Sequence, residues 1–168
     1  MKKILLALLI SFSSFAFAQE KPTIEFSSSS KLTINGQMVN NQTSIETITQ
    51  LLGTPQLVKE HKSGKKNYVY PELGLALQTF NDKLLMIGAN YNWDGDKNFP
   101  NKTFEGRFIV GKTVLDTNTT KDFIKSNSFL KFENLFLDLY VAGATDAAVM
   151  VGFKNNKITQ LGVEFKPN

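Results

Sequence analysis

The chain has 168 residues, a formal net charge of +4, one histidine and no cysteine. This length suits one domain of ordinary size or two small units that share a core. Thiol chemistry and the common zinc sites lack their ligands here. Acidic and basic residues are interspersed, so the charge gives no reason to expect nucleic acid or an anionic membrane as a partner.

Residues 1–18 have the layout of a secretory signal peptide. Two lysines follow Met1, the apolar segment Ile4–Phe15 comes next, and the letters AFA stand before Gln19 as a cleavage site. The alternative is a retained N-terminal helix, but the segment is short and interrupted by serines, unlike a membrane anchor. We therefore expect an exported protein, periplasmic or extracellular, that does not insert into a membrane after cleavage.

Residues 19–93 are predicted to form a first α+β unit that begins with strands. Apolar residues alternate through Lys21–Val39, and Asn35-Gly36 is a strong hairpin signal because both residues tolerate positive φ. The serine run at 27–30 is either a connection between two strands or a flexible linker. The alternation on both sides favours the connection.

The segment Thr43–Gly53 is the clearest helix signal in the chain. Thr43 can cap the helix, Glu46 completes a capping box, and the glycine at the end stops it. A helix this short needs a sheet to pack on. Gln56–His61 and Asn67–Tyr70 then read as strands around a Ser63-Gly64 turn.

A long hairpin signal appears twice. Leu73–Tyr91 has an apolar alternating run, a polar turn at Asn81-Asp82 and a second apolar run, and Ala147–Phe165 repeats this pattern at an offset of 74 with its turn at Asn155-Asn156. An even offset keeps each side chain on the same face of a sheet. The repetition predicts a duplicated hairpin.

Residues 94–102 read as a connecting loop, and 103–168 as a second α+β unit. A second short helix is expected from Thr119 onward, and Phe132–Val141 is predicted to be one strand. The sequence therefore predicts an α+β fold of two tandem β-β-α-β(2–4) repeats, each with a short helix packed on an antiparallel sheet.

Three features of the sequence are candidate functional sites. His61 lies among lysines and reads as a solvated turn residue without a partner for catalysis. Asp94, Asp96, Asn98 and Glu105 have the spacing of a calcium loop, but Phe99-Pro100 stands where that loop requires glycine, and ordinary turn preferences explain the same residues.

Tyr91 and Trp93 are the third feature. They belong to an aromatic cluster that is either core or an exposed platform for a sugar or peptide. The sequence assigns no catalytic residue, metal ligand or cofactor, and it leaves binding residues unidentified.

Several motifs resemble an uncharacterised family of exported bacterial proteins. They are the letters LLGTP at the end of the predicted helix, as in the LxxLGxP motif of that family, and Tyr68–Leu75, YVYPELGL, in place of Y-x-W-D-x-L-G-I. A looser likeness is to outer-membrane assembly lipoproteins and to the tandem repeats of β-lactamase inhibitor proteins. Both resemblances imply structural motifs and a role in protein interaction, with no catalytic residue.

The function expected from the sequence is that of a non-enzymatic, exported protein-interaction module, with an envelope or secreted protein as its partner. The alternative is a module that binds a small ligand, a sugar or peptide, in the cleft between the two units. Neither the partner nor the oligomeric state follows from the sequence.

Overall fold

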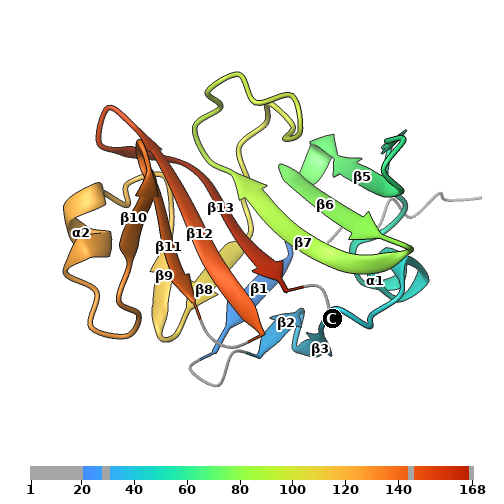
Figure 1. Cartoon of the computed structure of the whole chain (residues 1–168), viewed down its shortest axis with the longest axis horizontal. Helices are drawn as coiled ribbons and strands as arrows, with labels where there is room; N and C mark the ends of the chain where they lie inside the picture. Colours follow the sequence, from blue (N-terminus) through green and yellow to red (C-terminus); the bar gives the residue numbers. More distant parts are fainter. Residues whose placement is uncertain (1–20, 28–30, 144–145, 167–168) are drawn as a thin grey trace, which may run out of the picture.

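The computed structural model describes residues 21–27, 31–143 and 146–166, and it arranges them in two β-sheets (Figure 1). One sheet has five strands in the order β3-β2-β1-β8-β9, and the other has eight in the order β10-β11-β12-β13-β7-β6-β5-β4. The predicted signal peptide at residues 1–18 and most of the serine run lie outside the described residues.

The elements have the following bounds. The strands of the smaller sheet are β1 (Thr23–Phe26), β2 (Leu32–Ile34), β3 (Gln37–Val39), β8 (Arg107–Val110) and β9 (Thr113–Leu115). Those of the larger sheet are β4 (Leu57–Glu60), β5 (Lys65–Tyr70), β6 (Leu75–Phe80), β7 (Lys83–Asn90), β10 (Glu133–Phe136), β11 (Leu139–Gly143), β12 (Ala147–Lys154) and β13 (Lys157–Phe165). The helices are α1 (Ile45–Leu52), α2 (Lys121–Lys125) and a 3₁₀ turn, η1 (Pro71–Leu73).

The predicted α+β class is wrong, because the fold is mostly β. Strands and bridges hold 49% of the described residues and helices only 11%, and only α1 is longer than five residues. The α+β prediction gave the two short helices the weight of a structural layer. Strand pairing and the burial of sheet faces organise this chain instead.

The prediction of two tandem repeats, each with its own sheet, also fails. Strands from both predicted units are hydrogen-bonded into both sheets. β1 pairs in parallel with β8, and β7 pairs antiparallel with β13, where Gly88 lies opposite Gly162. The backbone edge that each unit would leave open is thus satisfied by the other unit, which is how a sheet removes an exposed edge.

The three polar turns form hairpins as predicted. Asn35-Gly36, Asn81-Asp82 and Asn155-Asn156 all have positive φ at both residues, between 50° and 80°. Positive φ at both central residues matches the right-handed twist of the strands that the turn connects. These turns set the β2–β3, β6–β7 and β12–β13 pairings.

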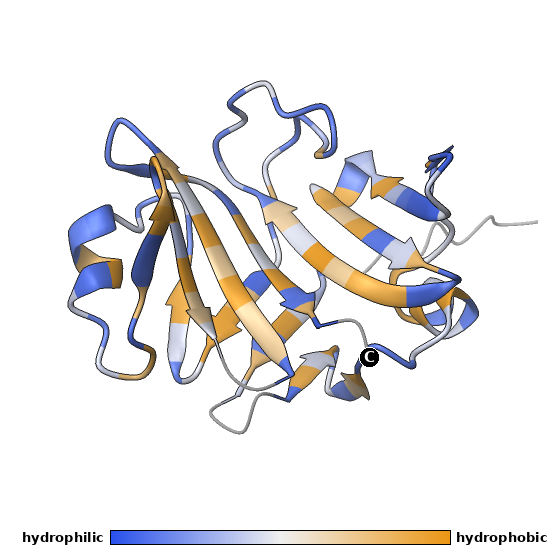
Figure 2. Ribbon diagram, in the orientation of Figure 1, coloured by the Kyte–Doolittle hydropathy of each residue, from blue (hydrophilic) through white to orange (hydrophobic). Residues whose placement is uncertain are grey.

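One core lies between the apolar faces of the two sheets and the inner sides of the helices. Along β1 and β12 every second residue is buried, as expected for strands with one face on a core. Figure 2 shows that orange, apolar residues gather on the strands of both sheets, whereas the turns and loops are mostly blue. The largest fully buried side chains are Tyr70, Phe26, Phe108, Ile24, Leu32 and Ile34.

The helix predictions are confirmed in place but corrected at the cap. The N-cap of α1 is Ser44, whose hydroxyl accepts from the backbone N–H of Thr47, while Thr43 accepts from Asn40 N–H instead. Gly53 ends the helix with φ of 80°. In the part of the chain that the structure describes, no helix has the length and apolar character needed to cross a bilayer.

Candidate functional site

His61 lies in the exposed turn between β4 and β5. Its backbone N–H donates to Lys65 O at 2.8 Å, and its carbonyl accepts from Gly64 N–H at 3.0 Å. The position agrees with the predicted solvated turn residue.

The loop with calcium-like spacing uses its carboxylates for turns and ion pairs. Asp94 Oδ1 accepts from Asp96 N–H and from the side chain of Gln160, and Asp96 Oδ1 accepts from Asn98 N–H. Glu105 instead pairs with Lys21 at 3.1 Å, and this contact lowers the pKa of the Glu105 carboxyl. Within the described ranges no three His, Cys, Asp or Glu side chains gather as a metal site.

Tyr91 and Trp93 have different environments and do not form a shared platform. Tyr91 is 3% exposed, its hydroxyl donates to Leu115 O at 2.9 Å, and its ring meets Phe104 edge to face at 6.1 Å. Trp93 is 51% exposed, and its indole N–H donates to Asp96 O. The core interpretation therefore holds for Tyr91 and is wrong for Trp93.

The most exposed apolar residues of the described chain lie at one margin of the larger sheet. Leu135, Phe136 and Leu137 are 66%, 67% and 78% exposed. They belong to β10 and the turn after it, and β10 is a terminal strand of the eight-stranded sheet. We call Glu133–Leu137 the β10 edge. An edge strand presents backbone N–H and C=O groups that no neighbouring strand satisfies.

The backbone of the β10 edge departs from a regular strand. Its pairing with β11 passes from Asn134 to Phe136, so Leu135 is the extra residue of a bulge. Leu137 has φ of 48°, a left-handed conformation that is unfavourable for a residue with a Cβ. The apolar side chains of this irregular segment, from Leu135 to Leu137, are all exposed.

Several contacts hold this turn in place. The side-chain amide of Asn134 donates to Leu137 O at 2.7 Å, and Phe153 N–H donates to Asp138 O at 3.0 Å. The Asp138 carboxylate pairs with Lys121 of α2 at 2.6 Å, which raises the pKa of the lysine. The turn is thus anchored to both β12–β13 and α2, so its apolar side chains are displayed on a supported backbone.

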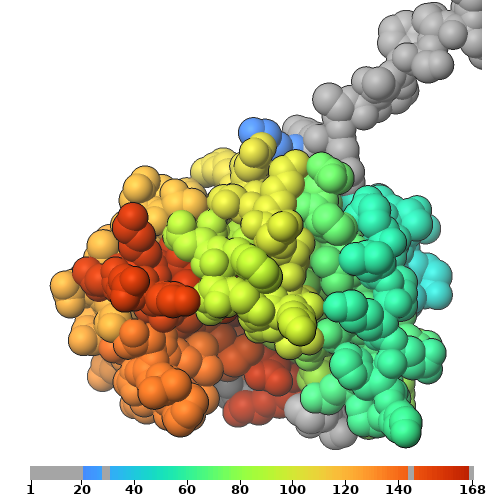
Figure 3. All heavy atoms as spheres, turned by 90° about the horizontal axis from the view of Figure 1, so that it is seen from above, coloured from blue at the N-terminus to red at the C-terminus, as the bar shows by residue number. Residues whose placement is uncertain are grey.

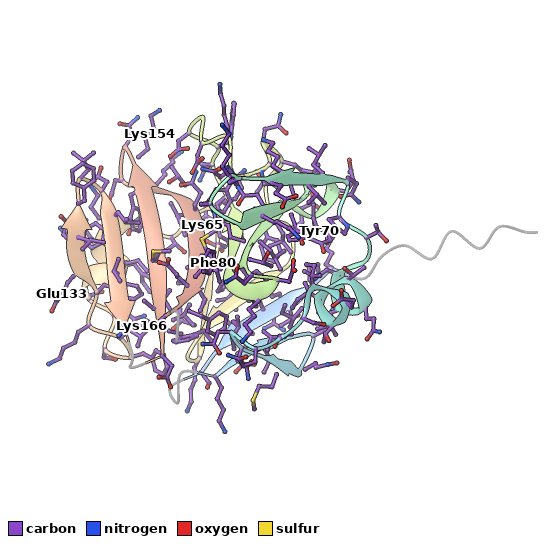
Figure 4. The ribbon with its side chains drawn as sticks, turned by 45° about the vertical axis from the view of Figure 1, so that its right-hand side comes forward. Lys65, Tyr70, Phe80, Glu133, Lys154 and Lys166 are labelled. Carbon is purple, nitrogen blue, oxygen red and sulfur yellow. The ribbon has the colours of Figure 1, made fainter. Side chains whose placement is uncertain are left out.

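Two hollows flank the β10 edge. The first, of about 420 Å³, is lined by residues that include Glu133, Leu135 and Val141. The second, of about 460 Å³, is lined by residues that include Phe136 and Lys154. Figure 4 shows Glu133 at the margin of the sheet and Lys154 at the top of β12. A strand added at this edge would have a recess near each end for its side chains.

The sequence prediction missed the β10 edge because it treated Phe132–Val141 as one strand. The structure has two strands there, with a reverse turn at Leu137-Asp138. A leucine at positive φ carries no turn signal. The available signal was the run of three large apolar residues, Leu135 to Leu137, which breaks the alternation of a half-buried strand.

Residues 23–125 match the model of a domain of unknown function, DUF7738. The chain belongs to this family. The match runs from β1 to α2 and confirms the expectation of a family without an assigned function. The β10 edge lies beyond the matched residues. No curated protein matches the sequence significantly.

Two solved structures resemble the fold at low sequence identity. One is an extracellular protein containing an SCP domain from Bacillus anthracis str. Ames, with a TM-score of 0.50 and 10% identity over 74% of this chain. The other is a cysteine-rich secretory protein from Staphylococcus aureus subsp. aureus Mu50, with a TM-score of 0.48 and 13% identity over 74% of this chain. The chain spans 44% of each of those proteins, so the likeness concerns the fold of part of them.

Proposed function

We propose that this protein is an exported, non-enzymatic interaction module that binds an extended apolar segment of a partner protein at the β10 edge. The segment adds to the eight-stranded sheet as a further strand beside β10. Main-chain hydrogen bonds supply the affinity in this mode, and recesses for alternate side chains supply the specificity.

The observation that carries the proposal is the exposure of Leu135, Phe136 and Leu137 on a terminal strand. Natural proteins usually protect such an edge with charged residues or proline, because an open apolar edge pairs with other chains. Here the apolar side chains are displayed on a turn that Lys121 and Asp138 anchor at 2.6 Å. Contiguous exposed apolar residues on a supported backbone are typical of a binding surface.

The opposite margin of the larger sheet differs in a way that favours β10. At β4, two exposed apolar residues, Leu57 and Val58, are followed by the charged pair Lys59 and Glu60. Lys59 also donates to Lys97 O of the loop between β7 and β8. The two charged side chains at the end of β4 oppose strand addition there.

Export is supported by the layout of residues 1–18, which predicts a signal peptide. Export is tested by expressing the full chain in cells that naturally make the protein. Mass spectrometry of the purified protein is expected to find an N-terminus at Gln19 in the envelope or medium fraction. A cytoplasmic protein that retains Met1 would contradict export.

Photo-cross-linking tests the interaction. A benzoylphenylalanine in place of Phe136 is expected to give one specific adduct in those cells, and the partner segment is then read from the cross-linked peptide. The double variant Leu135→Lys/Phe136→Lys is expected to weaken binding of the purified partner more than tenfold, because lysines on an edge oppose strand pairing. No adduct at Phe136, or unchanged affinity of the double variant, would overturn the proposal.

The matched control is Met38→Lys. Met38 is 56% exposed on β3, a terminal strand of the smaller sheet, so it carries the same kind of change at an edge away from β10. This variant is expected to leave partner binding unchanged. An equal loss of partner affinity in both variants would show a general effect of added charge and overturn the proposal. A cross-linked adduct between two copies of this chain would show that the edge serves self-association instead.

A further inference from the structure

A pocket of about 190 Å³ lies where the β6–β7 hairpin, the loop before α1 and the end of β13 meet. Asn81, Lys83 and Phe80 come from the hairpin, Asn41 and Gln42 from the loop, and Lys166 from the chain after β13. Figure 4 shows Phe80 near the centre of the molecule, with Lys166 below it and to the left, and Figure 3 shows red atoms of the C-terminal strand next to green atoms on one face.

The inner wall of this pocket is apolar. Leu84, Leu85 and Phe165 are buried core residues that border it, and Phe80 is 40% exposed at its mouth. An apolar wall of this kind releases water when an apolar group enters, which favours binding.

The rim carries positive charge without an acidic partner. Two lysines, Lys83 and Lys166, line the pocket together with the amides of Asn41, Gln42 and Asn81, and none of the described residues that line it is acidic. Neither lysine takes part in an ion pair among the described residues. The acidic neighbour of Lys83, Asp82, is paired with Lys66 at 2.8 Å. Uncompensated lysines beside amide donors attract a negatively charged group.

The two sides of the pocket are held together before any ligand arrives. The side-chain amide of Asn41 donates to Lys166 O at 3.3 Å, and Ser44 forms a backbone bridge with Lys83. The loop, the hairpin and the end of β13 are thus connected at the pocket. A preformed site loses less conformational entropy on binding than one that must be ordered.

We propose that this pocket binds a small organic monocarboxylate with an apolar body. The carboxylate contacts Lys83 and Lys166 at the rim, and the body lies against Leu85 and Phe165. The pocket volume equals that of about six water molecules in the liquid and is smaller than that of drug-sized sites. The ligand therefore has a single ring or a short chain. The site is separate from the β10 edge and does not depend on the function proposed for it.

Phenylacetate is the probe, with phenylacetamide and phenethylamine as analogues that keep the ring and change the charge. Titration followed by ¹⁵N–¹H NMR is expected to shift the backbone amides of Asn81, Lys83 and Lys166 with phenylacetate, at a Kd on the order of 1 mM for so small a ligand. The neutral and cationic analogues are expected to bind at least about fivefold more weakly, because each lacks the charge-assisted contacts. Equal shifts with all three probes, no shifts with phenylacetate up to about 10 mM, or shifts confined to other residues would overturn the proposal.

The variant Lys83→Gln/Lys166→Gln is expected to weaken phenylacetate binding about fivefold to tenfold and to leave phenylacetamide binding unchanged. Lys112→Gln, at an exposed position in the turn between β8 and β9, is the matched control and is expected to change neither. Loss of affinity for both probes in the double variant would indicate a structural effect and overturn the assigned role of the lysines. Leu135→Lys/Phe136→Lys is expected to bind phenylacetate normally, so failure of the β10 proposal and failure of this one give different results.

Discussion

The turn at Asn155-Asn156 closes the hairpin β12–β13 and also contacts the start of α2. Separate substitutions measure the contribution of the turn conformation and that of the contact with α2. Asn155 and Asn156 have φ of 51° and 62°, and Asn156 Oδ1 accepts from the backbone N–H of Lys121 at 3.2 Å. Glycine adopts positive φ freely but offers no side-chain acceptor. Valine resists positive φ at a cost of about 1–2 kcal/mol per residue.

Three variants follow from this geometry. Asn155→Gly is expected to change the free energy of unfolding by only a few tenths of a kcal/mol, because the turn conformation is kept. Asn156→Gly is expected to cost about 0.5–1.5 kcal/mol, because Lys121 N–H loses its acceptor. The double variant Asn155→Val/Asn156→Val is expected to cost about 2–4 kcal/mol from strain at both residues and the lost hydrogen bond.

Urea denaturation followed by circular dichroism measures these differences, with equal m-values as the check that the unfolded states are comparable. The matched control is Asn81→Gly in the β6–β7 turn, where φ is 50°. It is expected to behave like Asn155→Gly. Asn156→Gly as stable as Asn155→Gly would refute the link to α2, and an unchanged midpoint in the valine variant would refute the turn assignment.

Two further predictions concern two buried tyrosines and the loop between β7 and β8. Burial raises the pKa of Tyr70 to about 12 and raises the pKa of Tyr91 as well. Above about pH 10 the unfolded chain therefore loses phenolic protons that the folded chain keeps. The free energy of unfolding falls by up to about 1.4 kcal/mol per pH unit for each of these two tyrosines. Ultraviolet titration is expected to show these two ionising only as the protein unfolds, and ionisation of all four tyrosines in the folded protein would contradict this. A Cβ added to Gly88 would lie 2.7 Å from Phe99 Cε1, so Gly88→Ala is expected to cost about 1–3 kcal/mol and Phe99→Ala to remove most of that cost in the double variant. Thermal denaturation checks this cycle, and strictly additive effects would contradict direct contact.

Local chemistry was readable from the sequence wherever it depends on near neighbours. The hairpin turns at Asn35-Gly36 and Asn155-Asn156 and the helix stop at Gly53 follow from residues that tolerate positive φ. The helix starts were predicted to within a residue or two. Ser44 and Thr43 are both good caps, and the structure uses Ser44, whose backbone also forms a bridge with Lys83.

Only the tertiary structure decided how the strands combine. Side-chain alternation predicts that a strand has a buried face, but it does not say which strand is its neighbour. Nothing in the sequence shows that β1 lies beside β8 or β7 beside β13. These two pairings join the strands of the two expected repeats into shared sheets. The prediction of two separate repeats failed for this reason, whereas the α+β class failed because the helices are too short to form a layer.

The candidate sites follow the same division. Tyr91 and Trp93 are two residues apart, yet one is core and the other exposed, because β7 ends at Asn90 and the strand alternation that would place both on one face ends with it. Leu135, Phe136 and Leu137 are apolar in sequence and exposed only because β10 ends a sheet, and Lys83 and Lys166 meet only where distant segments converge. The sequence by itself determined the turns, the caps and the faces of the strands, since these depend on interactions within a few residues. Edges and pockets depend on contacts between residues far apart in the chain, so only the tertiary structure decided them.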